Sequence, residues 1–337
     1  MLTTKVFGQW QNKTVTEYIL TNKVGTKLSV MDYGATWLGL TVPSSKGDLP
    51  LLLRTDLATY SKPDAYFGKT IGRAAGRIGA NQYQIDKRIW QLPTNEGQTT
   101  LHGGPAGFSQ QLWTAVRTTD DLVTFELMLS PKQDGFYGNL TTQVTYQLTE
   151  DDQVVITATG MSDDGSLFNP TNHAYFNFNV TDAPITNHTV QLHSHQRFEL
   201  DSEKLPTGKL LRNHGTPFDF TAPQKLEPAL AKLTSTKERG IDDVFLIDAH
   251  PANFPIVTVH CSDITMQIFS NRNALVMYTS NIAELDLPLM GRSAMLHYGL
   301  VLEPQTAPSA IVDQKFGNIR LRPGQPQTTT WRYAFTY

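Results

Sequence analysis

Hydrophobic and polar residues alternate in short runs along most of the chain, and clusters of Gly, Pro, Asn and Asp interrupt these runs. Such alternation is typical of β-strands, because successive side chains of a strand point to opposite faces. The runs that predict strands are TVTEYILTN, TKLSVMDYG, NQYQIDKRIWQL, LVTFELMLS, TQVTYQLTEDDQVVITATG, TVQLHSHQRFEL, FPIVTVHCSDITMQIFS and TTWRYAFTY. Several of them contain a short polar link, DK, EDD or CSD, which predicts antiparallel hairpins.

Helical patterning is scarce. A short helix is predicted within PALAKLTS, which begins at Pro228, and a turn or two within DLATYSKPDAYFG. A doubly wound α/β fold would need a crossover helix after most strands, so the pattern argues against it. No low-complexity linker and no internal repeat divides the chain. We therefore predict an all-β fold of stacked antiparallel sheets, in one domain that spans residues 1–337.

One predicted strand, NPTNHAYFNFN, differs between its two faces. Ala174, Phe176 and Phe178 share one face, which we assign to the core. His173, Tyr175 and Asn177 share the other, which either meets water or lines a cavity.

Composition narrows the class of protein. Apolar residues make up 39% and charged residues 18% of the chain, an ordinary globular mixture, and the net charge of −3 disfavours nucleic acid and anionic membranes as partners. Cys261 is the only cysteine, so no intrachain disulfide is possible. The first residues have no basic head followed by an apolar run, and no run is long enough to cross a bilayer. We expect a cytoplasmic protein.

A glycine-rich run, FGKTIGRAAGRIGANQ, contains Arg73 and Arg77. It leads into a strand rather than a helix and lacks the glycine spacing of a phosphate loop, so a nucleotide site is not predicted. Glycines beside arginines suit a tight bend that offers a guanidinium to a ligand, although an ion-paired surface arginine is equally consistent. In LHGGPAGF, His102 precedes paired glycines, which suits either a binding role or an ordinary surface histidine.

Two carboxylates lie at predicted strand ends. Glu303 precedes Pro304, which we expect to end the strand; partial burial there would raise the pKa of Glu303 toward the range of a general base. Asp242 and Asp243 begin another strand and point to opposite sides, so only one can face a given cleft. Each of these carboxylates is also compatible with a purely structural role.

A pair of histidines, His193 and His195, would point to one side of a strand, as metal-binding histidines do. No third ligand with a recognisable spacing accompanies them. Solvated strand residues are the default interpretation, and no metal site is predicted.

Taken together, seven segments resemble the galactose mutarotase (aldose 1-epimerase) family in their order along the chain. They are YFGKTIGRAAGRI, LHGGPAGFSQQLW, NPTNHAYFNF, LPTG, GIDDVF, LVLEPQ and RPGQPQTTTWRY. The resemblance implies a single-domain β-supersandwich that interconverts the α and β anomers of a free aldose, typically galactose or glucose, without a cofactor or metal.

The resemblance also implies roles for individual residues. His173 would protonate the ring oxygen, and Glu303 would remove the proton of the anomeric hydroxyl. Arg77, His102 and Asp242 would hold the sugar, and Tyr175 would look toward the same cleft. These roles agree with the chemistry, because opening a hemiacetal needs an acid and a base, which we expect to flank the ring.

Departures from the family pattern fall near the expected sugar site. Pro304 stands where Thr is usual, Ser309 replaces an Asp, and Val276 lies where a sugar-contacting Gln is often found. Ser109 and Gln110 stand where Asp and Lys are common. These changes affect the expected sugar preference more than the reaction, and a disaccharide such as maltose would fit if the rim of the site is open.

Other functions stay open at this point. They are an epimerase of hexose 6-phosphates, which would want more basic residues than Arg73 and Arg77, a non-catalytic sugar-binding module, and a glycoside hydrolase, which usually employs paired carboxylates. The expected partner is a small sugar, and we expect a monomer or homodimer.

Overall fold

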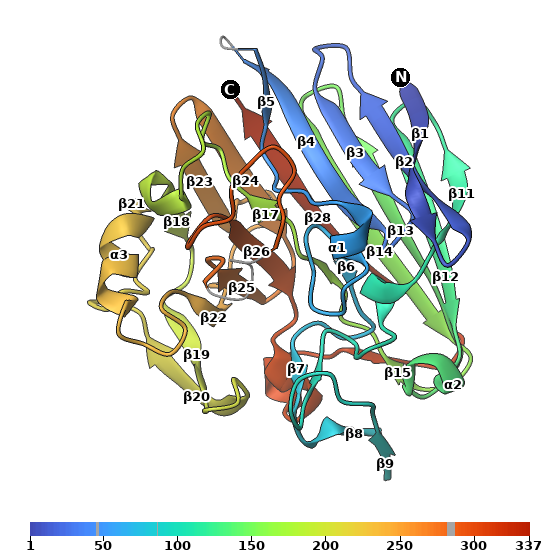
Figure 1. The fold of residues 1–337 in the computed structure, drawn as a ribbon. Coiled ribbons are helices and arrows are strands. Elements are labelled where there is room, and N and C mark those ends of the chain that lie inside the picture. Colours follow the sequence, from blue (N-terminus) through green and yellow to red (C-terminus); the bar gives the residue numbers. More distant parts are fainter. Residues whose placement is uncertain (45–46, 86, 282–286) are drawn as a thin grey trace.

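The computed structural model describes residues 1–44, 47–85, 87–281 and 287–337. It confirms the predicted all-β fold, a β-supersandwich of antiparallel sheets with a few short helices (Figure 1). None of the helices in the described part of the chain is long and apolar enough to span a lipid bilayer.

The largest sheet has nine strands in the order β11-β12-β13-β14-β28-β24-β23-β18-β21. Their bounds, in this order, are Thr114–Thr118, Leu122–Leu129, Leu140–Leu148, Gln153–Ser162, Gln327–Thr336, Ile264–Ser270, Val257–Cys261, Thr189–Leu192 and Gln224–Lys225. The last strand of the chain, β28, pairs with β14 on one side and with β24 on the other. It therefore joins strands from the first and second halves of the chain in one sheet.

Two further sheets complete the sandwich (Figure 1). The five-stranded sheet consists of β1 (Leu2–Trp10), β2 (Lys13–Thr21), β3 (Lys27–Met31), β4 (Thr36–Ser44) and β5 (Gly47–Pro50). The six-stranded sheet has the order β17-β26-β25-β22-β19-β20, with bounds Tyr175–Phe176, Leu300–Gln305, Ala274–Tyr278, Asp242–Leu246, Gln196–Leu200 and Pro206–Arg212.

An aromatic cluster joins the three sheets in the core. Trp37 of β4 contacts Phe176 of β17 and Tyr333 of β28, with ring centroids 5.6 and 5.0 Å apart, and the rings of Phe176 and Tyr333 lie 5.7 Å apart. All three side chains are fully or almost fully buried. Burial of such large rings supplies much of the hydrophobic stabilisation of a core.

Short ladders and helices connect the sheets. The two-stranded ladders are β6 (Thr70–Ile71) with β16 (Thr171–Asn172), β7 (Arg77–Ile78) with β10 (Thr100–Leu101), β8 (Gln82–Ile85) with β9 (Arg88–Gln91), and β15 (Ser166–Leu167) with β27 (Arg320–Leu321). The α-helices are α1 (Leu57–Tyr60), α2 (Pro131–Asp134) and α3 (Leu226–Leu233). Single 3₁₀ turns occupy Gly79–Asn81, Phe108–Gln110, Ile185–Asn187, Pro308–Ile311 and Gln314–Phe316.

Most of the predicted elements are confirmed. The three predicted hairpins are β8–β9, β13–β14 and β23–β24, although Asp86 in the first link lies outside the described residues. The two predicted helical segments correspond to α1 and α3. Helix α2 was not predicted.

Three predictions about strand boundaries were wrong. The run at 189–200 forms two strands in different sheets, β18 and β19, because the chain changes sheets at residues 193–195. The segment at 169–179 contains only the short strands β16 and β17, and both of its faces are buried. Pro304 does not end β26, because it remains paired with Leu275 of β25.

Candidate active site

A cleft of about 300 Å³ opens above the six-stranded sheet and is walled by the loops around β7 and β10. Its lining includes all six predicted site residues: Arg77, His102, His173, Tyr175, Asp242 and Glu303. Strands β22, β25 and β26 supply the floor, and the glycine-rich segments before β7 and after β10 supply one wall. Residues distant in sequence therefore meet at one place.

His173 and Glu303 lie next to each other in this cleft. His173 sits between β16 and β17, and Glu303 projects from β26. The distance between His173 Nε2 and Glu303 Oε1 is 3.7 Å, and both residues are buried. Nδ1 of His173 and Oε2 of Glu303 have no hydrogen-bond partner among the described residues. Buried polar atoms without partners are costly, so these two atoms are available to a polar ligand.

Burial shifts the pKa of each group in the direction that favours its neutral form. Desolvation lowers the pKa of His173 to about 4. Desolvation, assisted by the negative charge of Asp242, raises the pKa of Glu303 to about 8, against the opposing effect of Arg77. The predicted rise of the Glu303 pKa is thus present, although its cause is complete burial inside a strand rather than partial burial at a strand end.

His102 presents a fixed tautomer to the cleft. The backbone N–H of Gly76 donates a hydrogen bond to Nδ1 of His102 at 3.3 Å, and burial keeps the pKa of His102 well below its usual value. The neutral ring therefore carries its proton on Nε2, as a donor. The chain can approach so closely here because Gly103 has φ +87°, and a Cβ on it would lie 1.8 Å from the carbonyl oxygen of Gly72.

Arg77 is oriented by an acidic residue that the sequence analysis did not identify. Nε and Nη2 of Arg77 donate to the two carboxylate oxygens of Glu96, at 2.6 and 2.8 Å. This bidentate geometry fixes the plane of the guanidinium. Glu96 also lines the cleft and accepts a hydrogen bond from Thr99.

Aromatic rings surround His173. Its ring centroid lies 5.6 Å from that of Tyr66, 5.1 Å from that of Tyr175 and 6.5 Å from that of Tyr278. All three tyrosines line the cleft, which confirms that Tyr175 faces the same space as His173. Sugars have apolar C–H faces as well as hydroxyl groups, and such rings provide a surface for those faces.

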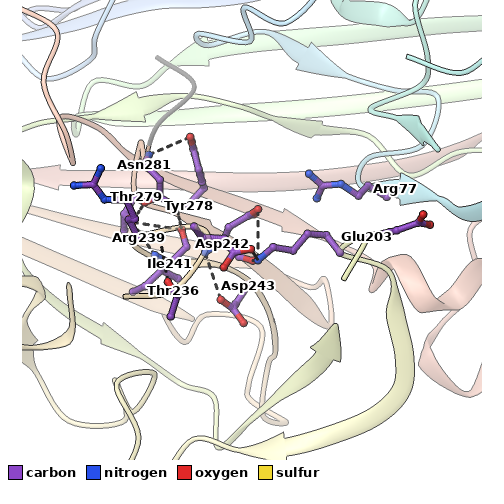
Figure 2. Close-up of polar contacts among 12 residues, drawn as sticks. Arg77, Glu203, Thr236, Arg239, Ile241, Asp242, Asp243, Tyr278, Thr279 and Asn281 are labelled. Atoms are coloured by element: carbon purple, nitrogen blue, oxygen red, sulfur yellow. Dashed lines mark hydrogen bonds and ion pairs between the residues drawn. The ribbon is translucent and has the colours of Figure 1, made fainter. Parts of the chain in front are cut away.

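Asp242 and Asp243 point to opposite sides of β22, as predicted (Figure 2). Asp242 lines the cleft, whereas Asp243 lies 3.6 Å from Nε of Arg197. Lys204, from the loop between β19 and β20, places its Nζ 3.9 Å from Oδ2 of Asp242 and 3.0 Å from Oε1 of Glu238. Lys204 was also missed by the sequence analysis.

Other candidates lie elsewhere. Arg73 is fully buried and bonded to Asp134, so it belongs to the scaffold and is not a surface arginine. His193 and His195 lie between strands, and His195 pairs with Asp248 at the surface, so the shared strand face expected for them does not exist. Asn177 is buried in a network with the carbonyl oxygens of Ala183 and Tyr298.

Among the residues that the structure describes, one set of side chains could hold a metal ion. Single ligand atoms of His102, His173 and Glu303 lie within 4.8 Å of one another. Two imidazoles and a carboxylate are a ligand set that zinc accepts. The atoms of His173 and Glu303 in this set are those that proton transfer would use.

Some of the cleft residues that the sequence analysis did not predict lie in segments with a recognisable sequence pattern, and others do not. Tyr66, Lys204 and Gln305 lie in or beside segments that resemble the family, namely YFGKT, LPTG and LVLEPQ. Glu96 lies in a polar turn with no distinguishing pattern. Of the departures noted above, Val276 lines the cleft, and Ser309 is buried but is not part of the lining.

Comparison with known proteins identifies the family. The family model described as aldose 1-epimerase matches residues 16–334. The chain belongs to the aldose 1-epimerase family. It is 34% identical to a maltose epimerase from Levilactobacillus brevis, over 99% of each chain, and 31% identical to an aldose 1-epimerase from Streptococcus thermophilus, over 99% of this chain and 97% of that one. These relatives are isomerases, so the enzyme class predicted for this aldose 1-epimerase family member is confirmed.

Solved structures of the family have the same fold. An aldose epimerase homologue from C. elegans superposes with a TM-score of 0.88 and 27% identity, over 95% of this chain and 98% of that one. A galactose 1-epimerase from Lactobacillus acidophilus superposes with a TM-score of 0.84 and 25% identity, over 99% of this chain and 98% of that one.

Proposed function

We propose that this aldose 1-epimerase family member interconverts the α and β anomers of a free hexose such as galactose or glucose, with His173 and Glu303 as its proton-transfer pair. The observation that carries the proposal is the juxtaposition of these two buried groups, 3.7 Å apart, in a cleft lined by hydrogen-bonding and aromatic side chains. General acid–base catalysis of this kind contributes roughly 10²–10⁴-fold, and oriented binding adds to it.

The pair lies closer together than the sequence analysis expected, and this spacing is compatible with the reaction. The ring oxygen and the anomeric hydroxyl are both attached to C1, so the two oxygens that exchange protons are close neighbours. An acid and a base that serve them can therefore also be neighbours, on one side of the sugar. His173 and Glu303 therefore do not need to lie at opposite ends of the ring.

In the proposed ring opening, Glu303 takes the proton of the C1 hydroxyl while His173 gives a proton to the ring oxygen as the C1–O5 bond breaks. Rotation about C1–C2 exposes the other face of the carbonyl group, and the reverse transfers close the ring. The pair holds one proton before and after each step. No nucleophile or electron acceptor is required.

The side chains and charges around the pair favour one location of that proton. Burial favours neutral His173 and protonated Glu303, which is the form of the pair after ring opening. Ring opening needs the proton on His173, and the positive charge of Arg77 acts in this direction because it lowers the pKa of Glu303. We propose that Arg77 and the hydroxyl groups of the bound sugar together favour that form.

A second candidate substrate is a disaccharide with a free reducing end. The name of the maltose epimerase relative supports it, as does Val276 at a position where a sugar-contacting Gln is often found. A hexose 6-phosphate has less support. Arg77 is already paired with Glu96, and Arg73 is buried in the scaffold.

Polarimetry tests the proposed function directly. Crystalline α-galactose or α-glucose is dissolved, and the optical rotation is followed with and without the protein. We expect faster equilibration with the protein, lost in Glu303→Gln and His173→Asn, and retained in Asp243→Asn, whose carboxylate points away from the cleft. Sugar binding without acceleration would support a binding module, and release of monosaccharides from a glycoside would support a hydrolase.

Location and assembly stay predictions. We propose a cytoplasmic enzyme that is a monomer or a homodimer. Cell fractionation tests the first statement, and light scattering during size-exclusion chromatography tests the second.

A further inference from the structure

A second hollow adjoins the cleft described above. Its volume is about 410 Å³, and four of its lining residues, Arg77, Glu96, Lys204 and Asp242, also line the inner cleft. We call it the outer hollow; the residues that line it alone include Gln98, Ser202, Glu203, Lys237 and Glu238. Because four residues line both spaces, the inner cleft and the outer hollow are direct neighbours.

The lining of the outer hollow is polar throughout. Apart from Gly97, every residue that lines it carries a hydroxyl, amide or charged group. Three cationic side chains are balanced by four carboxylates, so the hollow offers many donors and acceptors with little net charge. A phosphate would meet nearby carboxylates there. A neutral ligand with many hydroxyl groups fits this chemistry, because hydroxyls both donate and accept hydrogen bonds.

The wall of the outer hollow is held in place by a network of hydrogen bonds behind it (Figure 2). The backbone N–H of Ile241 donates to Oγ1 of Thr279 at 3.0 Å, and its carbonyl oxygen accepts from Nδ2 of Asn281 at 3.1 Å. A Cβ at Gly240 would lie 2.0 Å from Oδ1 of Asn281, so this packing requires glycine. The segment that carries Glu238 and Asp242 is thus fixed by hydrogen bonds and close packing.

Lys204 links the two spaces. Its Nζ lies 3.0 Å from Glu238, which lines only the outer hollow, and 3.9 Å from Asp242, which lines both. Nζ also donates to the backbone carbonyl oxygen of Asp242 at 3.3 Å. Through these contacts Lys204 connects the Asp242 carboxylate with Glu238 in the wall of the outer hollow.

From this geometry we infer that the outer hollow is a second sugar subsite. A reducing disaccharide binds with its reducing-end ring beside His173 and Glu303, and its second ring lies against the wall that includes Glu203 and Glu238. The substrate class is therefore a neutral oligosaccharide that has a free anomeric carbon and a second ring attached through a hydroxyl other than that at C1. This inference rests on the proposed function, since the inner cleft must hold the reacting ring.

Blocking the outer hollow separates the two substrate classes. Ser202 and Gln98 are exposed residues that line the outer hollow alone, from different loops. We expect Ser202→Trp and Gln98→Trp each to lower kcat/KM for maltose at least tenfold, mainly through KM, and to leave kcat/KM for glucose within about twofold. A tenfold change corresponds to about 1.4 kcal/mol, the scale of one or two lost hydrogen bonds. Ser202→Ala and Gln98→Ala are the matched controls: each removes one polar group without filling the hollow, so it should lower kcat/KM for maltose much less than the tryptophan variant and leave glucose unchanged.

Both sugars are measured by polarimetry on the same preparations, and retained activity on glucose shows that each variant is folded. A wild-type enzyme that epimerises glucose but not maltose, cellobiose or lactose overturns the second subsite and leaves the proposed function standing. The subsite is also overturned if the two tryptophan variants affect both sugars equally or neither. No acceleration with any sugar, monosaccharides included, overturns the proposed function itself.

Discussion

At the scale of single residues, the site is governed by the burial of two titratable groups side by side. Desolvation disfavours the imidazolium form of His173 and the carboxylate form of Glu303, which moves their pKa values apart, to about 4 and about 8. Between these values the pair carries one proton.

A bell-shaped pH profile follows from this proton count. Only the form with one proton can deliver a proton to one oxygen and accept one from the other. We expect kcat/KM to fall as the pH drops through about 4, where the pair holds two protons, and as the pH rises through about 8, where it holds none. Initial mutarotation rates between these limits, corrected for the uncatalysed rate, test the prediction.

A substitution of Asp242 tests whether Glu303 is responsible for the alkaline limb of the pH profile. Its negative charge contributes to the raised pKa of Glu303, so Asp242→Asn should move the alkaline limb to lower pH. Asp243→Asn is the control, because Asp243 lies beside Arg197 on the other side of the strand. An alkaline limb that stays in place in Asp242→Asn would contradict the assignment of that limb to Glu303.

Glu303 should also lower the stability of the protein at neutral pH. In the unfolded chain it loses its proton near pH 4.3, whereas in the folded protein it keeps the proton up to about pH 8. Stability is therefore lost as the pH rises above the unfolded value, and the loss is complete near the folded value. Glu303→Gln should raise the free energy of unfolding by roughly 1–3 kcal/mol at pH 8 and by much less at pH 4.

Urea unfolding of the wild-type protein and Glu303→Gln at both pH values measures this difference. The variant should gain stability while it loses activity, as happens when a group is retained for function at a cost in stability. Equal stabilities at pH 8 would show that the protein compensates the buried carboxylate in another way.

At the scale of elements, the sequence predicted the strands whose residues alternate and whose links are short. It identified the β13–β14 and β23–β24 hairpins, because alternation and a polar link are both local signals. It did not predict the break at residues 193–195, because a change of sheet needs only a local bend and leaves the alternation on both sides intact. Pro304 remained in β26 because proline lacks only the donor of one ladder bond.

The candidate site shows the same limit. The sequence analysis placed His173 and Glu303 in one cleft because the segments around them resemble a known family, but it expected them to flank the sugar ring, whereas they lie 3.7 Å apart. The orienting partner of Arg77 could not be predicted, since the pairing of β7 with β10 brings Glu96 to it from a loop without a sequence pattern. Such partners are set by the packing of loops, which depends on the whole fold.

The pairing of β7 with β10 leads to a prediction about how Glu96 supports substrate binding by Arg77. It brings Glu96 close enough to hold the guanidinium through two hydrogen bonds. Without that carboxylate, Arg77 must be ordered by the substrate itself, so Glu96→Ala should raise KM about tenfold and change kcat less. Glu96→Gln, which keeps one acceptor, should have a smaller effect. Saturation kinetics by polarimetry measure both parameters.

Glu199→Ala is a matched control, because it removes another ion-paired glutamate, one that lies in β19 beside Lys209 and outside the cleft. A merely structural role of Glu96 would lower stability and leave KM unchanged in the folded fraction. An unchanged KM in Glu96→Ala would therefore exclude its orienting role.

At the scale of the whole molecule, the three sheets share one core. The hydrophobic cluster that contains Trp37, Phe176 and Tyr333 extends continuously from β2 to β28, and β28 is the central link of the nine-stranded sheet. Strand β14 from the first half of the chain and strand β24 from the second half thus both pair with β28. No part of this core can be removed without exposing the rest to water.

This architecture predicts one cooperative unfolding transition, as expected if residues 1–337 form a single domain. Trp331 of β28 is buried in the shared core, and Trp331→Ala should cost about 3–5 kcal/mol. Scanning calorimetry should show a single transition that moves by several degrees as a whole, with equal calorimetric and van't Hoff enthalpies. Thr330→Ala, at the exposed neighbouring position, should shift it little. Two transitions, of which Trp331→Ala moves only one, would show instead that the two halves of the large sheet unfold separately.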